Sequence, residues 1–193
     1  MRVSRAVHAT TNNLFVSSKT ATAIPAACPL IRDALVQASL DPLVRSIEFI
    51  EQAKVGAAQV EINAIVITRD DGRYLLDVIP SYPARERMAL AAIDQLGLPS
   101  IALTAADIRG EPRFTNSRLV WSYRHHPVGI GLRLSILQAL VEDGPMTLAR
   151  LLSSIRSERD PSQAVMALAC SNLIELDLVS GPLGPLTIAR YRA

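Results

Sequence analysis

The chain of 193 residues has two cysteines, and this low number excludes two classes of small protein. Cys28 and Cys170 lie far apart, and neither has a Cys or His neighbour at the spacing of a metal site. A disulfide framework and a zinc module are therefore excluded, and two reduced thiols are typical of a cytoplasmic protein. No apolar stretch approaches the roughly 18 to 20 residues of a membrane-spanning helix, because charges interrupt each one. The sequence predicts a cytoplasmic protein without a membrane segment.

Lysine and aromatic residues are also scarce. Lys19 and Lys54 are the two lysines, so arginine supplies almost all of the 20 basic residues, against 18 acidic ones. The net charge of +2 excludes a strongly basic, histone-like protein but leaves room for a local basic surface. Hydrophobic residues make up 49% of the chain, which is enough for a core and excludes disorder of the whole chain.

Residues 1–28 differ in composition from the rest. They are rich in Ser, Thr and Ala, and they contain no acidic residue, since the first one is Asp33. We expect a flexible N-terminal arm whose basic residues could follow a nucleic-acid backbone. An acid-free leader with arginines is also compatible with a targeting segment such as a mitochondrial transit peptide.

Residues 29–128 carry the pattern of a small α/β domain. Helical spacing alternates with short stretches of strand spacing, and Asp70-Asp71-Gly72 is a hairpin turn signal. The expected helices cover 29–40, 83–96 and 115–124, and the expected strands cover 44–50, 60–67, 74–79 and 100–104. A turn is expected at 107–112. This order predicts a small mixed sheet with flanking helices.

Residues 129–193 are expected to form a second unit. Three helices are predicted at 132–141, 147–154 and 160–173, followed by strands at 174–179 and 186–189. Three helices and a β-hairpin predict a winged helix-turn-helix domain, in which the third helix often enters the DNA major groove. Gln163 and Asn172 are then the candidate base-reading residues. Basic and acidic residues balance in this unit, so we expect it to bind DNA weakly by itself.

The candidate phosphate-binding residues lie just before this unit. Arg109, Arg113, Arg118 and Arg124 gather after the fourth strand and along the helix that follows. Cations on one surface bind phosphates, which makes this cluster a candidate DNA contact. The competing interpretation is an ordinary solvated helix face.

Three segments of the chain resemble a known family. They are 31–44 (IRDALVQASLDPLV), 61–80 (EINAIVITRDDGRYLLDVIP) and 96–124 (LGLPSIALTAADIRGEPRFTNSRLVWSYR). A hairpin ending in an acidic residue and followed by a helix resembles the restriction-endonuclease-like core of the PD-(D/E)xK nucleases. The stretch from 31 to 191 is similar to the TnsA-type transposon endonucleases, which join such a core to a C-terminal winged helix.

The resemblance implies a degenerate catalytic site. In the family, carboxylates hold magnesium over the scissile phosphate and a lysine assists the nucleophile. The corresponding positions in this chain are Ile31, Asn63, Asp77 and Ile79. One of the four groups is kept, and isoleucine can neither bind a metal nor carry charge. The resemblance therefore implies a nuclease fold without a catalytic site, a metal or another cofactor.

The leading hypothesis is a non-catalytic protein that binds double-stranded DNA, as a transcription regulator or an accessory factor of a mobile genetic element. One alternative is a divergent, magnesium-dependent endonuclease that uses Asp77 and Glu61. Glu61 lies two residues from Asn63, on the same side of an extended strand. The other alternative is a protein-interaction module that forms a homodimer or pairs with a recombinase or transposase.

Overall fold

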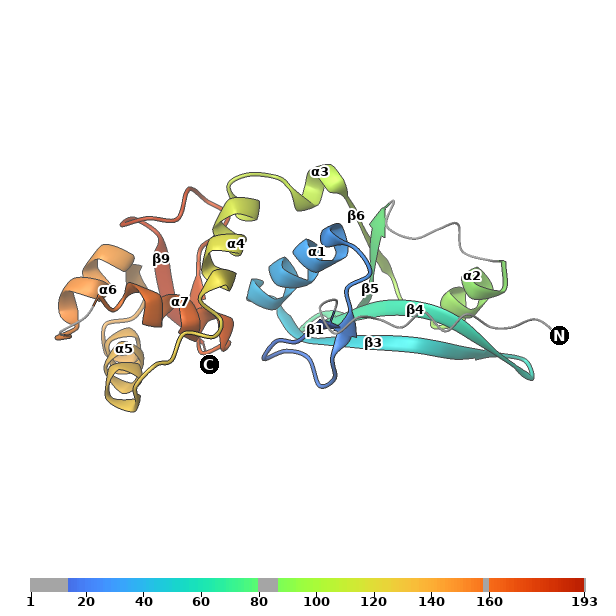
Figure 1. The fold of residues 1–193 in the computed structure, drawn as a ribbon, viewed down its shortest axis with the longest axis horizontal. Coiled ribbons are helices and arrows are strands. Elements are labelled where there is room, and N and C mark those ends of the chain that lie inside the picture. Colours follow the sequence, from blue (N-terminus) through green and yellow to red (C-terminus); the bar gives the residue numbers. More distant parts are fainter. Residues whose placement is uncertain (1–13, 80–86, 158–159, 193) are drawn as a thin grey trace.

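A four-stranded mixed sheet lies at the centre of the N-terminal part of the chain (Figure 1). The computed structural model describes residues 14–79, 87–157 and 160–192. Neighbours in the sheet follow chain order, antiparallel up to β5 and parallel between β5 and β6. The strands are β3 (Val44–Val55), β4 (Ala58–Arg69), β5 (Gly72–Ile79) and β6 (Ser100–Thr104). The predicted α/β class with a mixed sheet is confirmed.

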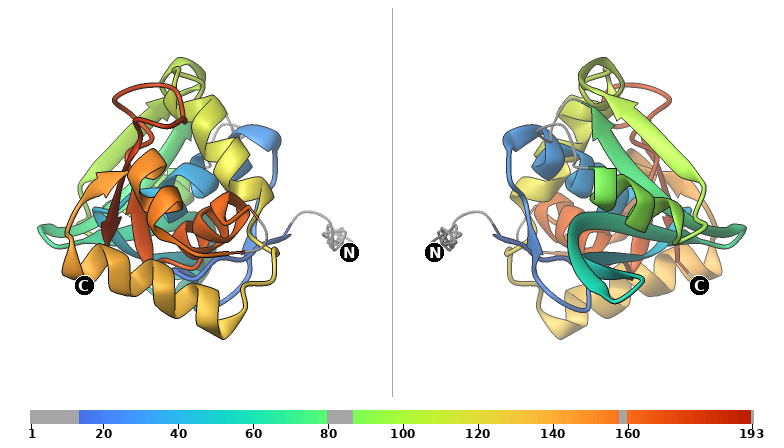
Figure 2. Two further views of the ribbon diagram at one scale, coloured as in Figure 1. Left: turned by 90° about the vertical axis from the view of Figure 1, so that its left-hand side faces the viewer. Right: turned by 90° about the vertical axis from the view of Figure 1, so that its right-hand side faces the viewer.

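Helices cover both faces of this sheet. α1 (Pro29–Leu40) packs on one face, where Ile65 and Ile67 of β4 are buried. α2 (Arg87–Asp94) packs on the other face, over Ile62 and Ala64, and rests against the β3–β4 hairpin (Figure 2). β4 is apolar on both sides because it is covered on both sides. The predicted start of the second helix at Pro83 lies outside the described residues.

Local signals placed some element ends correctly. α1 ends before Asp41-Pro42, and a two-residue turn joins Arg69 of β4 to Gly72 of β5, as predicted. The prediction of a turn at 107–112 is wrong for its first two residues, because they belong to the short helix α3 (Ala105–Ile108). Thr104 and Asp107 form a capping box, in which each side chain bonds the backbone N–H of the other, and this stabilises the short helix.

The C-terminal part contains three helices and a three-stranded sheet of order β7-β9-β8. Its elements are α5 (Ile130–Glu142), β7 (Met146–Thr147), α6 (Leu148–Ser154), α7 (Ser162–Cys170), β8 (Ile174–Leu176) and β9 (Ile188–Tyr191). The two-residue β7 is too short to leave a pattern in the sequence. α7 ends three residues earlier than predicted, and Asn172 follows with a positive φ of 61°, a conformation that terminates helices.

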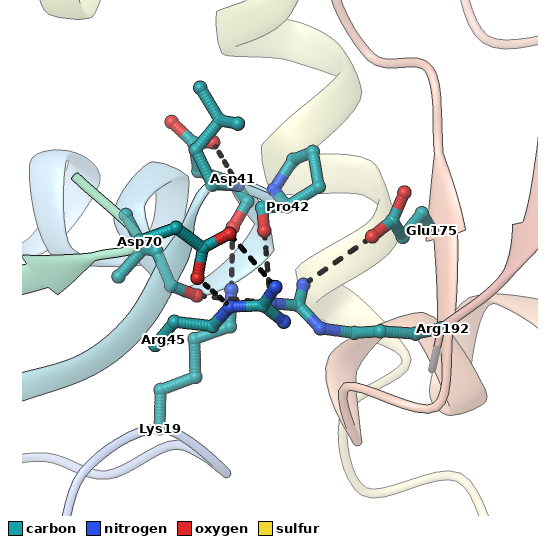
Figure 3. A network of polar contacts seen from close by, with 9 residues as sticks. Lys19, Asp41, Pro42, Arg45, Asp70, Glu175 and Arg192 are labelled. Atoms are coloured by element: carbon teal, nitrogen blue, oxygen red, sulfur yellow. Dashed lines mark hydrogen bonds and ion pairs between the residues drawn. The ribbon is translucent and has the colours of Figure 1, made fainter.

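One continuous set of buried side chains joins the two parts. α4 (Arg113–Ser122) packs against α1 on one side and α7 on the other. Its Val120 and Trp121 belong to the same core cluster as residues of the sheet and of the C-terminal helices. A polar network also crosses this junction (Figure 3). The Arg192 guanidinium donates to the carbonyl oxygens of Pro42 at 2.9 Å and Val44 at 3.2 Å.

Residues 14–28 are packed on the body of the molecule, which differs from the flexible arm expected for 1–28. β1 (Leu14–Phe15) pairs with β2 (Ile24–Pro25). The Phe15 ring is buried and stacks on Trp121 at a centroid distance of 5.2 Å. Apolar residues among Ser and Thr anchor this segment. The first 13 residues lie outside the described ranges.

Both cysteines are free thiols, as predicted. Burial raises the pKa of Cys170 to about 12, so this thiol is unreactive at neutral pH. In the described ranges, no helix combines the length and the apolar character needed to cross a bilayer.

Candidate functional site

A groove of about 700 Å³ opens between α1, α4 and the residue that follows α3. Three of the four arginines predicted to contact phosphates line it: Arg109, Arg118 and Arg124. A fourth arginine, Arg32 of α1, completes the set and was not singled out from the sequence. Asp33 is the acidic residue in the lining. We call this site the arginine groove; its other lining residues are Pro29, Val36, Phe114, Trp121 and Ser122.

The secondary structure explains why these side chains meet. Phe114, Arg118, Trp121 and Ser122 are spaced by four, three and one residues, which places them on one face of α4. Arg124 follows the end of that helix. The other wall combines one face of α1 with Arg109, the residue at the C-terminal cap of α3. The groove is therefore built from regular elements on both sides.

Aromatic rings hold two of the guanidinium groups. The Arg118 Cζ lies 5.4 Å from the centre of the Phe114 ring, and the Arg124 Cζ lies 5.6 Å from that of Trp121. The Arg124 Nη1 also donates to the Trp121 carbonyl oxygen at 3.2 Å. Stacking on aromatic faces orders a guanidinium while leaving its outer N–H groups available. These cations are thus ordered before any anion binds.

Two arginines of the sheet are paired with carboxylates, whereas the groove arginines are not paired in the described part of the chain. Arg45 lies 2.6 Å from Asp70, whose pKa it lowers through a hydrogen bond, and Arg73 lies 2.7 Å from Glu48. Within the described part of the chain, no carboxylate lies within 4 Å of the guanidinium nitrogens of the four groove arginines. The arrangement can accept an anion with several negative charges.

Arg113, the fourth predicted phosphate contact, lies outside the arginine groove. Its Nη2 bonds the Asp41 carboxylate at 3.2 Å, and Arg69 lies 3.9 Å from the same group. Asp41 is largely buried, so this cluster ties the start of α4 to the end of α1. Arg113 therefore makes a structural contact within the chain.

The two candidate base-reading residues lie at opposite ends of α7. Gln163 is exposed at its beginning, and Asn172 follows its end. All seven residues between Ala164 and Cys170 are buried. The helix contacts α1, α4, α5 and β8, so it is mainly a core element, with Gln163 exposed at its beginning.

The degenerate nuclease positions do not all lie on one side of the sheet. Ile31 is fully buried in the core on the α1 side of the sheet, together with Leu76 and Val78 of β5. Because side chains alternate along a strand, Asp77 and Ile79 belong to the opposite face. Asn63 has a φ of 46° and lies at a β-bulge, where two residues of β4 oppose one residue of β3. These four residues do not line the arginine groove.

The carboxylates of the alternative endonuclease site are not neighbours. Continuing the register from the Ile65–Leu76 pair places Asp77 opposite Ala64. Glu61 lies three residues further along β4, a separation of roughly 10 Å along the strand. Among the described residues, no group of three or more His, Cys, Asp or Glu could hold a metal ion.

Two polar residues without a local sequence signal hold α4 and the end of α1 in place. The buried Asn116 amide donates to the Leu178 and Gly181 carbonyls at 3.0 and 2.8 Å and accepts from the Leu183 N–H at 2.9 Å. It joins α4 to the loop between β8 and β9. Lys19 Nζ donates to the Asp41 carbonyl at 2.6 Å (Figure 3). Contacts between residues so distant in sequence leave no local signal.

The chain matches no model of a known protein family, and comparison with curated proteins found no relative. The arginine groove is therefore the feature from which a function is argued.

Proposed function

We propose that this protein binds double-stranded DNA without cleaving it, and that the arginine groove holds the phosphate backbone. The observation that carries this proposal is the meeting of Arg32, Arg109, Arg118 and Arg124 around one groove that contains a single carboxylate. Arginine guanidinium groups match phosphate oxygens in geometry as well as charge. Phosphate contacts supply much of the affinity of proteins for DNA.

The biological role we propose is that of a transcription regulator or an accessory factor of a mobile genetic element, acting in the cytoplasm. The TnsA-type resemblance supports this role, because a nuclease fold that lacks its carboxylate cluster also lacks repulsion toward DNA. Isoleucine at positions 31 and 79 is incompatible with the metal and lysine functions of that family.

We also propose that residues 129–193 form a winged-helix unit. Its order of helix, strand, two helices and two strands, with β9 between β7 and β8, supports this assignment. The burial of α7 gives this unit a packing role toward α4, instead of the base-reading role that a third helix often has. Binding through the groove is then largely independent of DNA sequence.

A fluorescence-anisotropy titration of a labelled 20-base-pair duplex at low salt tests the groove. We expect Arg118→Ala and Arg124→Ala each to weaken binding by about three- to tenfold, since each removes one phosphate contact. Arg150→Ala is the matched control, because Arg150 lies on α6 and is exposed and paired with Asp143. Equal affinities for all three variants would contradict the proposal.

Cleavage is tested separately with supercoiled plasmid in magnesium or manganese. We expect no nicking by the wild-type protein. Nicking that disappears in Asp77→Ala would support the endonuclease alternative and contradict a non-catalytic role. Nicking that persists in that variant would indicate a contaminating nuclease, and the proposal would stand.

A further inference from the structure

The four arginines of the arginine groove differ in exposure. Arg109 and Arg118 are exposed, whereas Arg32 and Arg124 are partly buried. The phosphates of an unbroken duplex lie along the outside of a convex helix, so a duplex that passes over the groove meets the exposed arginines first. The partly buried pair is better suited to a phosphate that projects from its molecule, as the phosphate at the end of a strand does.

The volume of the groove suits a small group in the same way. About 700 Å³ lies within the range of sites that enclose a small ligand, roughly 300 to 1,000 Å³. The last nucleotide of a strand can enter a hollow of this size. An unbroken duplex is too wide to do so, because its major groove alone is roughly 12 Å across.

The charge in the groove exceeds what one internal phosphate neutralises. Four guanidinium groups and one carboxylate line the groove, a formal surplus of three positive charges. A phosphodiester within a strand carries a single negative charge, whereas a terminal phosphate carries about 1.5 to 2 at pH 7 and offers three strong acceptor oxygens. Guanidinium groups bind such oxygens in pairs. A terminal phosphate is therefore the better match for the charge of the groove.

The packing of Arg124 prepares it to bind such a group. Its guanidinium lies over the Trp121 ring, and its Nη1 donates to the Trp121 carbonyl oxygen at 3.2 Å. Trp121 is held in turn, because it is buried and its ring stacks on Phe15. This bond uses one of the five N–H donors of the guanidinium. The other donors can bind phosphate oxygens with little further loss of side-chain freedom.

Asp33 distinguishes the groove from a plain phosphate-binding surface. Its carboxylate lines the groove together with the arginines. A carboxylate repels phosphates, but it accepts hydrogen bonds from base amino groups such as N4 of cytosine. The sugar and phosphate groups within a DNA strand offer no N–H or O–H donor. A site with both arginines and a carboxylate is therefore complementary to a whole terminal nucleotide, with its phosphate and its base.

We infer that the arginine groove binds the phosphorylated end of a DNA strand, with Arg32 and Arg124 holding the terminal phosphate and Asp33 facing the terminal base. This inference rests on the proposed function, to which it adds a preference of the groove for a strand end over continuous duplex. A free nucleotide offers the same chemistry, a phosphate on a nucleoside. The experiment therefore distinguishes the two sources.

Anisotropy at low salt tests the inference with three duplexes of the same 20-base-pair sequence and the same internal label. One has 5′-phosphate ends, one has 5′-hydroxyl ends, and one is closed by a hairpin loop at each end. We expect the phosphate-ended duplex to bind about five- to tenfold more tightly than the hydroxyl-ended one, because of its extra charge and acceptors. The closed duplex should bind no more tightly than the hydroxyl-ended one.

Variants connect this preference to the groove. Arg32→Ala and Arg124→Ala should each remove the preference for the phosphate-ended duplex. Arg150→Ala is the matched control, because Arg150 is exposed and paired with Asp143 on α6, away from the groove, and this variant should keep the preference. Circular dichroism of each variant verifies that it is folded. A preference that survives in both groove variants would overturn the inference.

The outcomes separate this inference from the proposed function. Equal affinities of wild-type protein for the phosphate-ended and hydroxyl-ended duplexes would overturn the inference, and the proposed function would stand if Arg124→Ala weakened both. Failure of all three duplexes to bind would contradict the proposed function, and the inference with it.

Deoxyadenosine 5′-monophosphate, added as a competitor, separates a strand end from a free nucleotide. We expect it to displace the phosphate-ended duplex only at millimolar concentration, because it lacks the neighbouring phosphates of a strand. Displacement of all three duplexes at micromolar concentration would assign the groove to free nucleotides and overturn the inference.

Discussion

At the residue scale, Lys19 is the group whose environment departs most from that of an exposed side chain. The residue is 5% exposed, and its amine lies near Arg192 (Figure 3). Burial, with a further contribution from Arg192, lowers the pKa of Lys19 to about 7 from the usual 10.5. A lysine shifted this far links the stability of the fold to pH.

The direction of that linkage follows from the two pKa values. Between pH 7 and 10.5 the unfolded chain holds the Lys19 proton and the folded chain releases it, so stability rises with pH. We expect the free energy of unfolding, measured with urea, to gain about 2 kcal/mol from this residue between pH 7 and 9. In Lys19→Met this gain should disappear. An unchanged pH dependence in the variant would show that Lys19 does not titrate in this range.

Asn116 supports the wall of the site through three hydrogen bonds. Asn116→Ala leaves buried backbone groups without partners, so we expect a loss of about 2 to 3 kcal/mol in the free energy of unfolding. Thr115→Ala changes an exposed neighbour in the same helix and should cost less than half as much. Urea denaturation of both variants measures the difference. Equal midpoints for the two would contradict the role given to Asn116.

Individual site residues were predicted from closeness in sequence, which does not give their direction around a helix. Arg118 and Arg124 were found because they are close together in sequence. Arg113 was assigned to the same surface, but five residues of helix separate it from Arg118, a rotation of about 140°. Arg32 was missed because α1 reaches the groove through tertiary packing. Spacing along the chain contains no information about such long-range contacts.

At the element scale, the apolar pattern of α7 indicates both the helix and its burial. The run Ala164–Cys170 is apolar around the whole helix, which is typical of a buried helix. That signal was present in the sequence, but the expected winged-helix topology suggested an exposed third helix. The ends of α1 and of β5 at Ile79 were predicted well, because turn residues and Pro act locally, whereas β3 continues to Val55, five residues beyond its predicted end.

The burial of α7 has a consequence for DNA binding. Gln163→Ala should change the affinity for duplex DNA by less than twofold, because the seven residues that follow it on α7 are buried in the core. Arg124→Ala, in the same anisotropy assay, is the positive comparison. A loss of more than fivefold in Gln163→Ala would show that this end of α7 contacts DNA.

At the scale of the whole molecule, the sequence predicted the mixed sheet and its Asp70-Asp71-Gly72 hairpin, and it did not predict the packing between the two parts of the chain. The hairpins of the sheet join neighbouring segments, so their pairing follows from chain order. The continuous core through α4 depends on surfaces that meet across more than 100 residues, such as Arg192 on Pro42. The packing of Phe15 on Trp121 is of the same kind.

The most direct test of the arginine groove is the salt dependence of DNA binding between 50 and 200 mM salt. Four phosphate contacts give a slope of log Kd against log salt of about 3 to 4. We expect that slope for the wild-type protein, and a slope of about 1 for a variant with Arg109, Arg118 and Arg124 all changed to Ala. The same slope for both proteins, or a wild-type protein that does not bind DNA at low salt, would contradict the account.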